Sequence, residues 1–148
     1  MLTLDDVLES WKKDAIIDEL NLDETSKQTA RLHAKYLELL SVTRLRLKQK
    51  EMEQKVLLRD KWLHFNGKLD KETIDKYGWP YDPFNGLKIM KSDMEYYFNS
   101  DPELQKQESQ IAYLKTLVET LQEIMENLKW KHQTIKNILE WRKFTSGV

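Results

Sequence analysis

The fold is decided by residues 104–139, which read LQKQESQIAYLKTLVETLQEIMENLKWKHQTIKNIL. Hydrophobic residues recur there every seven positions, and a second set follows three positions after the first. In heptad notation the a positions are Leu104, Ile111, Val118, Met125, His132 and Leu139, and the d positions are Leu114, Leu121, Leu128 and Ile135. A repeat sustained over about four heptads predicts a long α-helix that packs against other helices.

The apolar stripe is wider than a two-stranded coiled coil needs, because the g positions Leu117, Ile124 and Ile138 are also apolar. A helix that is apolar on this many positions requires neighbours on two sides, so we expect a bundle or a higher oligomer. The polar His132 is interpreted as a core residue that sets the register of the helix. The residues expected to join subunits are Ile111, Leu114, Leu117, Val118, Leu121, Ile124, Met125, Leu128, Ile135, Ile138 and Leu139.

The rest of the chain also reads as helical, which predicts an all-α fold. Thr3 followed by Asp6 resembles a helix cap, and we expect a first helix over residues 4–18. Residues 25–65 contain no Gly or Pro but are apolar on two opposite sides, so they form either one sandwiched helix or a hairpin. A short helix is expected over 91–98, and Asp101 with Pro102 is a typical helix start.

Most of the Gly and Pro residues lie between Gly67 and Gly86, which predicts a long loop and a hinge between two halves. We therefore expect three parts. Residues 1–66 form a helical part that binds single-stranded DNA, 67–90 a linker, and 91–148 a helical part that drives assembly.

Composition excludes several classes of protein. The chain of 148 residues has four Gly and no Cys, and it contains neither a phosphate-binding loop nor a dinucleotide-binding fingerprint. The absence of Cys excludes a disulfide framework and a thiolate zinc site. No apolar run reaches the roughly 18–20 residues of a membrane span, and the start is acidic, unlike that of a signal peptide.

The sequence gives little support to catalysis. The three histidines, His33, His64 and His132, are far apart, and no His and carboxylate cluster has the spacing of metal ligands. Paired acids on the helices are interpreted as solvated faces. We therefore expect no enzyme activity, no metal and no cofactor.

The charge is nearly balanced overall, at 24 basic and 25 acidic residues, but it is strongly patterned along the chain. Residues 1–24 carry a net charge of −6, 25–68 carry +7, 69–127 carry −6 and 128–148 carry +4. The basic segment mixes cations with aromatic residues, a combination suited to single strands because cations contact phosphates and rings stack on unpaired bases. The alternative is a solvated helix face that ends at a buried Trp62. The candidate residues for DNA binding are Arg44, Arg46, Lys48, Lys50, Lys55, Arg59, Lys61, Trp62, His64 and Phe65.

Two further groups of aromatic residues could either pack or contact DNA. Between the loop residues Tyr77 and Phe84 packing is favoured, because Asp75 and Asp82 bracket them with negative charge. Trp130 and Trp141 lie within about 20° of each other on a helix with 3.6 residues per turn. Packing against the N-terminal half is the preferred interpretation for this pair too.

Three segments resemble the UvsY-like recombination mediators of T-even-type phages and their cyanophage relatives. They are LDDVLESWKKDAIID at residues 4–18, KVLLRDKWLHFNG at 55–67 and NLKWKHQTIKNILEWRKF at 127–144. The resemblance covers nearly the whole chain except the loop at 67–86, which is longer and more aromatic here.

The resemblance implies a helical protein without enzyme activity in the cytoplasm of the infected bacterial host. Such proteins bind single-stranded DNA and help a RecA-like phage recombinase to load onto DNA covered by the phage single-strand-binding protein. They form closed rings of six or seven subunits through the C-terminal helical part. The DNA-binding pair of the family matches Arg59 and Lys61, in swapped order, so charge is kept but bidentate geometry need not be.

Three other classes of protein explain the sequence less well. A helical structural or assembly protein accounts for the heptads but not for the basic segment 25–68. A nuclease would need clustered acidic metal ligands, which the sequence lacks. A dimeric transcription factor would need a compact helix-turn-helix, and no suitable Gly-containing turn is evident.

Overall fold

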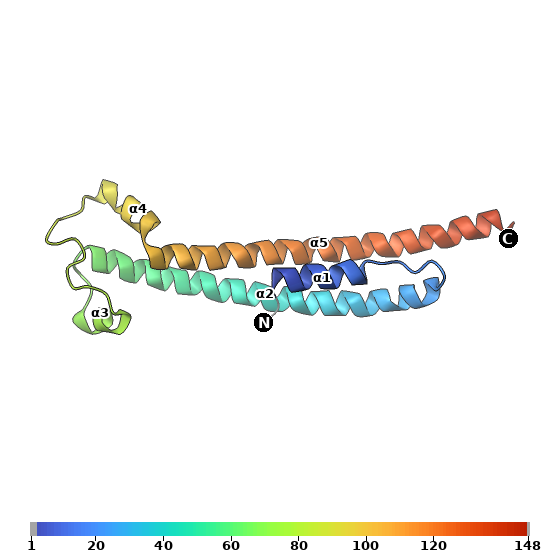
Figure 1. The fold of residues 1–148 in the computed structure, drawn as a ribbon, viewed down its shortest axis with the longest axis horizontal. Helices are drawn as coiled ribbons and strands as arrows, with labels where there is room; N and C mark the ends of the chain where they lie inside the picture. The colour runs from blue at the N-terminus through green and yellow to red at the C-terminus, as the bar shows by residue number, and fades with distance from the viewer. Residues whose placement is uncertain (1–2, 148) are drawn as a thin grey trace. The chain divides into compact units, whose positions relative to one another are not determined.

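The computed structural model describes residues 3–147, and these residues form five α-helices and no β-strand. The helices are α1 (Leu4–Asp14), α2 (Leu22–Phe65), α3 (Lys71–Tyr77), α4 (Lys91–Ser100) and α5 (Pro102–Thr145), shown in Figure 1. The all-α prediction is confirmed. Residues 1, 2 and 148, at the outer ends of the predicted parts 1–66 and 91–148, lie outside the described residues.

Both predicted helix starts are confirmed by hydrogen bonds. The Thr3 hydroxyl accepts from the Asp6 amide at 3.1 Å, and the Asp6 carboxylate accepts from the Thr3 amide at 3.0 Å, which is a complete capping box. The Asp101 carboxylate accepts from the Leu104 amide at 3.0 Å and so caps α5. Helix α1 ends at Asp14, four residues earlier than expected.

Helix α2 is one continuous helix of 44 residues, which decides between the two interpretations of this segment. It ends in a left-handed turn at Gly67, whose φ is +70°. The Lys68 amide donates back to the Leu63 carbonyl at 2.8 Å, as in the Schellman motif that commonly closes a helix. The turn therefore directs Lys68 back toward the last turn of α2.

The segment 67–86 is not a simple loop, because it contains helix α3. Asp70 caps this helix by accepting from the Thr73 amide at 3.0 Å. Gly78 ends it at a φ of +74°, a conformation that favours glycine. The expectation of an uninterrupted loop was wrong here, since both capping residues were present in the sequence.

The chain divides into two compact units whose borders cross both long helices. One unit takes the chain up to Leu45 and again from Leu114 onward, and the other takes residues 46–113. These borders differ from the predicted boundaries at residues 66 and 90. The assignment of DNA binding and assembly to particular parts of the chain stays a prediction.

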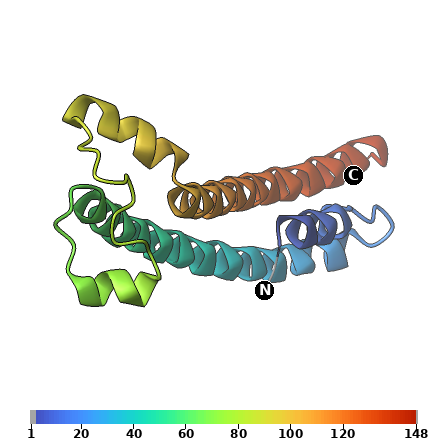
Figure 2. The ribbon, with the colours of Figure 1, turned by 60° about the vertical axis from the view of Figure 1, so that its left-hand side comes forward.

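In the first unit α1 packs against the N-terminal half of α2 and the C-terminal half of α5 (Figures 1 and 2). The rings of Trp11 and Tyr36 meet edge to face with centroids 5.6 Å apart. Asp14 receives hydrogen bonds of 2.7 Å from both Lys35 and Tyr36, and Lys131 donates to the Asp14 carbonyl at 2.7 Å. One residue at the end of α1 thus contacts both long helices.

In the second unit α3 and α4 lie beside the C-terminal end of α2 (Figure 2). Ile74 of α3, Trp79 of the following turn and Met94 of α4 are buried. This small core positions the connection between the long helices, and it contains the aromatic loop residues whose packing was expected.

The buried stripe of α5 shifts along the helix relative to the heptad. The a positions Leu104, Ile111 and Val118 are buried, whereas His132 and Leu139 at later a positions are exposed. Toward the C-terminus the g position Lys131 is buried instead. The interpretation of His132 as a core residue was wrong.

Most of the eleven residues expected to join subunits are buried inside the single chain. The buried ones are Ile111, Leu114, Leu117, Val118, Leu121, Ile124, Leu128 and Ile135. Met125 and Ile138 are partly exposed and Leu139 is exposed. The buried eight support the fold of the chain itself, so contact with a second copy would fall to the other three and to other exposed residues.

Within residues 3–147 no helix combines the length and the apolar character that crossing a membrane requires.

Candidate nucleic-acid interface

The candidate DNA-binding residues of the second unit all lie on or at the end of α2, so their faces follow from the helical period. At about 100° per residue, Lys48, Lys55, Arg59 and Trp62 fall within an arc of about 60°. All four side chains are exposed. They form a continuous cationic face with an exposed aromatic ring at its end, and we call them the basic face.

Other candidates lie elsewhere on the helix. Arg46 is exposed but lies about 160–180° from Lys48 and Lys55 at this period. Lys50 is half-buried: its ammonium lies 3.2 Å from Glu53 and its carbonyl accepts from Gln107 at 3.2 Å. Arg44 is exposed and belongs to the first unit.

Lys61 is buried, with 6% of its side chain exposed. Its ammonium lies 3.0 Å from the Asp101 carboxylate and 3.3 Å from that of Glu103, and 4.1 Å from the centroid of the Trp79 ring. Trp79 in turn donates from Nε1 to Glu103 at 2.5 Å. Lys61 therefore joins α2 to the start of α5 and to the aromatic loop, and in this conformation it offers no surface to a phosphate.

Arg59 is the exposed member of the pair, with 66% of its side chain accessible. Its Nε and Nη2 both lie 3.1 Å from Oδ1 of Asp60, which is buried and also accepts from the Tyr77 hydroxyl at 2.6 Å. Burial and this hydrogen bond raise the pKa of Tyr77 to about 12. Asp60 thus holds the guanidinium at the surface while Tyr77 fixes the carboxylate.

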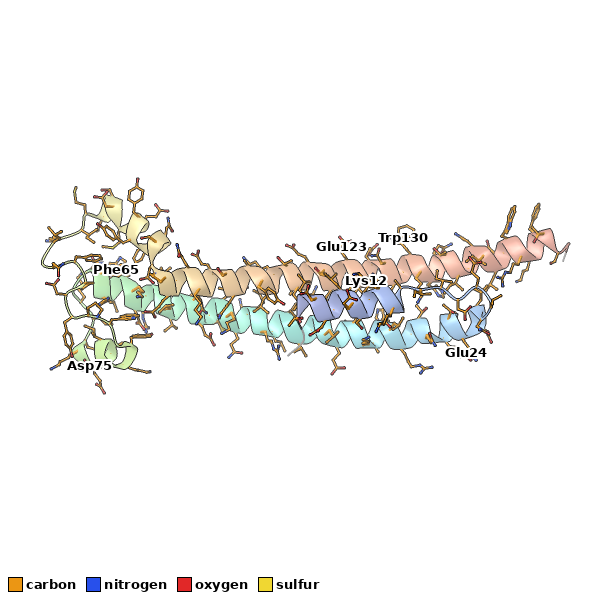
Figure 3. The ribbon with its side chains drawn as sticks, in the orientation of Figure 1. Lys12, Glu24, Phe65, Asp75, Glu123 and Trp130 are labelled. Atoms are coloured by element: carbon orange, nitrogen blue, oxygen red, sulfur yellow. The ribbon has the colours of Figure 1, made fainter. Side chains whose placement is uncertain are left out.

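His64 and Phe65 are packing residues in this structure. His64 is buried, and its Nε2 lies 2.6 Å from the Pro80 carbonyl oxygen. The Phe65 ring, marked in Figure 3, stacks on Phe98 and meets Phe84 edge to face, with centroids 5.5 and 5.2 Å away. Neither side chain presents a free face to a base.

The loop aromatics pack as expected, with one exception. The rings of Tyr77 and Trp79 are parallel within 4°, with centroids 4.0 Å apart. Phe84 packs between Phe65 and Tyr97. Tyr81 is exposed and donates its hydroxyl hydrogen bond to Asp75. The preferred interpretation therefore holds for Tyr77, Trp79 and Phe84.

The preferred interpretation was wrong for the C-terminal tryptophans. Trp130 is 61% exposed and Trp141 is 65% exposed, and Figure 3 shows Trp130 on the side of α5 away from α1. The neighbour that does contact the N-terminal segment is Arg142, which donates to the Glu19 carbonyl at 2.7 Å. These rings remain available to a partner.

Sequence reasoning missed Lys68 as a neighbour of the basic face. Its ammonium lies 5.3 Å from the centroid of the Trp62 ring, a cation–π distance. Only the turn at Gly67 brings it there, and Gly67 following the helix was the one available signal. Among residues 3–147 no group of three or more potential ligands could hold a metal ion.

Fold and surface together define a class: an all-helical protein with two long helices, one of which carries an exposed cationic face that ends in a tryptophan. The family model described as "Recombination, repair and ssDNA binding protein UvsY" matches residues 10–148. The chain therefore belongs to the UvsY family of recombination, repair and single-strand-binding proteins, as the resemblance indicated.

Individual relatives agree with this assignment. The chain is 24% identical over 146 residues to the recombination protein uvsY of Enterobacteria phage T4, an alignment that covers 99% of each chain. It has the fold of the crystal structures of the phage T4 recombination mediator protein UvsY. Lattice type II matches at a TM-score of 0.84 and 23% identity over 99% of both chains. Lattice type I matches at 0.80 and 23%, over 95% of this chain and 98% of the other.

Proposed function

We propose that this chain is a recombination mediator of a phage. It binds single-stranded DNA and promotes the loading of a RecA-like phage recombinase onto DNA covered by single-strand-binding protein, in recombination-dependent replication and repair. It acts without catalysing a reaction, in the cytoplasm of the infected host. The observation that carries the proposal is the basic face of α2 in a chain of the UvsY family.

The basic face suits a flexible single strand better than a duplex. Exposed cations spaced along one helix can follow a phosphate chain, and an exposed indole offers a surface to an unpaired base. Arg59 is the strongest single candidate, because its guanidinium is exposed while Asp60 fixes its orientation. In this proposal Lys61 supports the site through α5 and the aromatic loop.

We further propose that the chain assembles with itself into a closed ring of six or seven subunits. Exposed apolar residues on α5, among them Leu139, Trp130 and Trp141, support a contact with another protein surface. A ring would place several modest DNA sites on one particle, which raises the effective concentration of each site for a bound strand. The strand held in this way would be presented for nucleation of the recombinase.

The test of DNA binding is fluorescence anisotropy with a labelled single strand of mixed sequence, repeated across salt concentrations with duplex as competitor. Binding to single strands changes by about 0.7 log units per log unit of salt for each phosphate neutralised. Tight binding with a steep slope and weak competition by duplex would support the proposal. Absence of binding at low salt would favour the second candidate, a helical assembly protein without a DNA role.

The mediator step needs a separate assay. Recombinase is added to a strand already covered by single-strand-binding protein, and filament formation is followed with and without this chain. Faster nucleation is expected with the wild-type chain. The Arg59→Ala variant should give less acceleration, because it removes an exposed cation from the basic face.

A further inference from the structure

A pocket of about 390 Å³ lies beside the end of the basic face, between the last turn of α2 and helix α4. Its volume is within the range of about 300–1,000 Å³ typical of small-ligand sites. It lies entirely within the second unit. The residues that line it are Trp62, Asn66, Lys91, Met94, Glu95 and Phe98.

The walls of the pocket are apolar and held in place. Trp62 is 41% exposed, so part of its ring is free to contact a ligand. Phe98 is fixed by stacking on Phe65, with ring planes 23° apart, and Met94 is buried beneath. A flat aromatic ligand fits between such walls, because stacking on an indole needs little beyond a free face.

Cations surround the pocket on the side of the basic face. Lys68 lies over the Trp62 ring, and Lys91 lines the opposite wall on α4. Within residues 3–147 neither lysine takes part in an ion pair. Arg59 precedes Trp62 by about one helical turn. An aromatic ligand in the pocket would therefore have positive charge nearby for an attached phosphate.

The two polar groups of the lining that face this ligand class are both hydrogen-bond acceptors. Glu95 carries a carboxylate, which only accepts when ionised. Asn66 donates its amide nitrogen to the Trp62 carbonyl at 2.7 Å, which leaves its amide oxygen as the free group. Acceptors favour a base with an exocyclic amino group, such as cytosine, and disfavour thymine, which presents a carbonyl oxygen at the same ring position.

We propose that this pocket receives one base of a bound single strand, stacked on Trp62, and that Glu95 and Asn66 make it favour amino-bearing bases over thymine. Lys68, Lys91 and Arg59 contact the adjoining phosphates. The proposal rests on the proposed function, because the strand must first be bound along the basic face. It adds a base preference to a surface that otherwise contacts only phosphates.

The test compares dC and dT oligonucleotides of equal length by anisotropy at one salt concentration, since both bases have the same ring size. The wild-type chain should bind the dC strand about fivefold more tightly, the low end of the discrimination that one contact to a base edge provides. Glu95→Gln should abolish the preference, because its amide can donate to the carbonyl oxygen of thymine. Trp62→Ala should weaken binding to both strands and remove the preference, with the salt slope unchanged.

Matched variants separate the pocket from general effects. Trp62→Phe keeps a stacking ring and should keep the preference for dC even where Trp62→Ala folds poorly. Trp130→Ala and Glu123→Gln change an exposed tryptophan and an exposed glutamate on α5 and should behave like the wild-type chain.

Two outcomes overturn the proposal in different ways. Equal binding of dC and dT by the wild-type chain, or a preference that survives both Glu95→Gln and Trp62→Ala, removes the base pocket and leaves single-strand binding intact. Failure of every oligonucleotide to bind at low salt removes the proposed function and the pocket together.

Discussion

Arg59 and Lys61 are two positions apart on α2, yet their surroundings differ completely. Arg59 is exposed and held by Asp60, whereas Lys61 is enclosed by Asp101, Glu103 and Trp79. Removing a buried cation leaves its carboxylate partners without compensation, while removing an exposed one does not. The basic pair therefore combines a residue for binding with a residue for structure.

Replacing Lys61 by Met should destabilise the chain by about 3 kcal/mol, near the low end for breaking a buried ion pair because Glu103 is partly exposed. The measurement is the free energy of unfolding in urea. Arg59→Met is the matched control and should change it by less than about 0.5 kcal/mol, as is usual for surface positions. Equal losses in the two variants would contradict the division of roles.

The same two variants should separate in DNA binding. Arg59→Met should flatten the salt slope by about 0.7, the contribution of one phosphate of a single strand. Lys61→Met, measured where it remains folded, should keep the wild-type slope. A flattened slope in Lys61→Met would show that its ammonium reaches the phosphates after all.

Asp14 and Tyr36 connect α1 to α2 and make stability depend on pH. Burial and the hydrogen bond to Asp14 raise the pKa of Tyr36 to about 12 from 10.0. A pKa raised by folding means that the stabilisation is complete below pH 10 and is lost as the pH rises toward 12. Tyr77 shifts in the same direction, to about 12.

We therefore expect the free energy of unfolding to fall over this alkaline window. In Tyr36→Phe it should fall less steeply, because one of the two titrating hydroxyls is gone. Tyr96→Phe, an exposed tyrosine on α4, is the control and should follow the wild-type curve. A wild-type curve that is flat across the window would contradict the contribution of Tyr36.

At the scale of helices, the sequence predicted the long elements and their capped starts correctly. Capping depends on neighbouring residues, so Thr3 with Asp6 and Asp101 with Pro102 could be recognised locally. Helix α3 was missed because its seven residues are too few for a hydrophobic period. The continuity of α2 could not be decided, since two apolar sides are compatible with one helix or two.

The burial of α5 shows why the heptad misled at its C-terminal end. A straight helix has 3.6 residues per turn, so a seven-residue repeat drifts by about 20° per heptad. Over the heptads from Leu104 to Leu139 this drift moves the buried side from the a toward the g positions. Lys131 is accordingly buried and His132 exposed. Periodicity alone could not show whether the partner of the stripe was the same chain or another copy.

Replacing Leu121 by Ala should destabilise the chain by about 2–5 kcal/mol, because its side chain is fully buried and the change leaves a cavity. Leu139→Ala is the control on the same helix and should cost far less, since this leucine is exposed. Urea unfolding of both variants measures the difference. Similar losses would mean that Leu139 is also covered in the species that unfolds.

At the scale of the whole molecule, the described surface retains large apolar side chains that a single chain leaves uncovered. Leu139, Trp130, Trp141 and Phe144 all lie on the C-terminal half of α5. The rings of Trp141 and Phe144 stack with centroids 5.7 Å apart and are exposed together. Such residues commonly mark a contact with another protein surface.

The double variant Ile138→Asp with Leu139→Asp should therefore sediment as a smaller species than the wild-type chain, because charge replaces apolar contact. Circular dichroism should show unchanged helix content, since neither side chain is fully buried. The conservative control is Glu140→Gln. Persistence of the full assembly in the double variant would assign self-association to another surface.

The contacts of Lys61 also have an evolutionary consequence. Lys61 and Glu103 are 42 residues apart in the chain, and their charges are in contact. A natural variant that loses the charge at one of these positions would relieve selection on the other, so the two should change together across phage populations. In a screen for suppressors of a charge reversal at position 61, second-site changes should accumulate at Asp101 and Glu103.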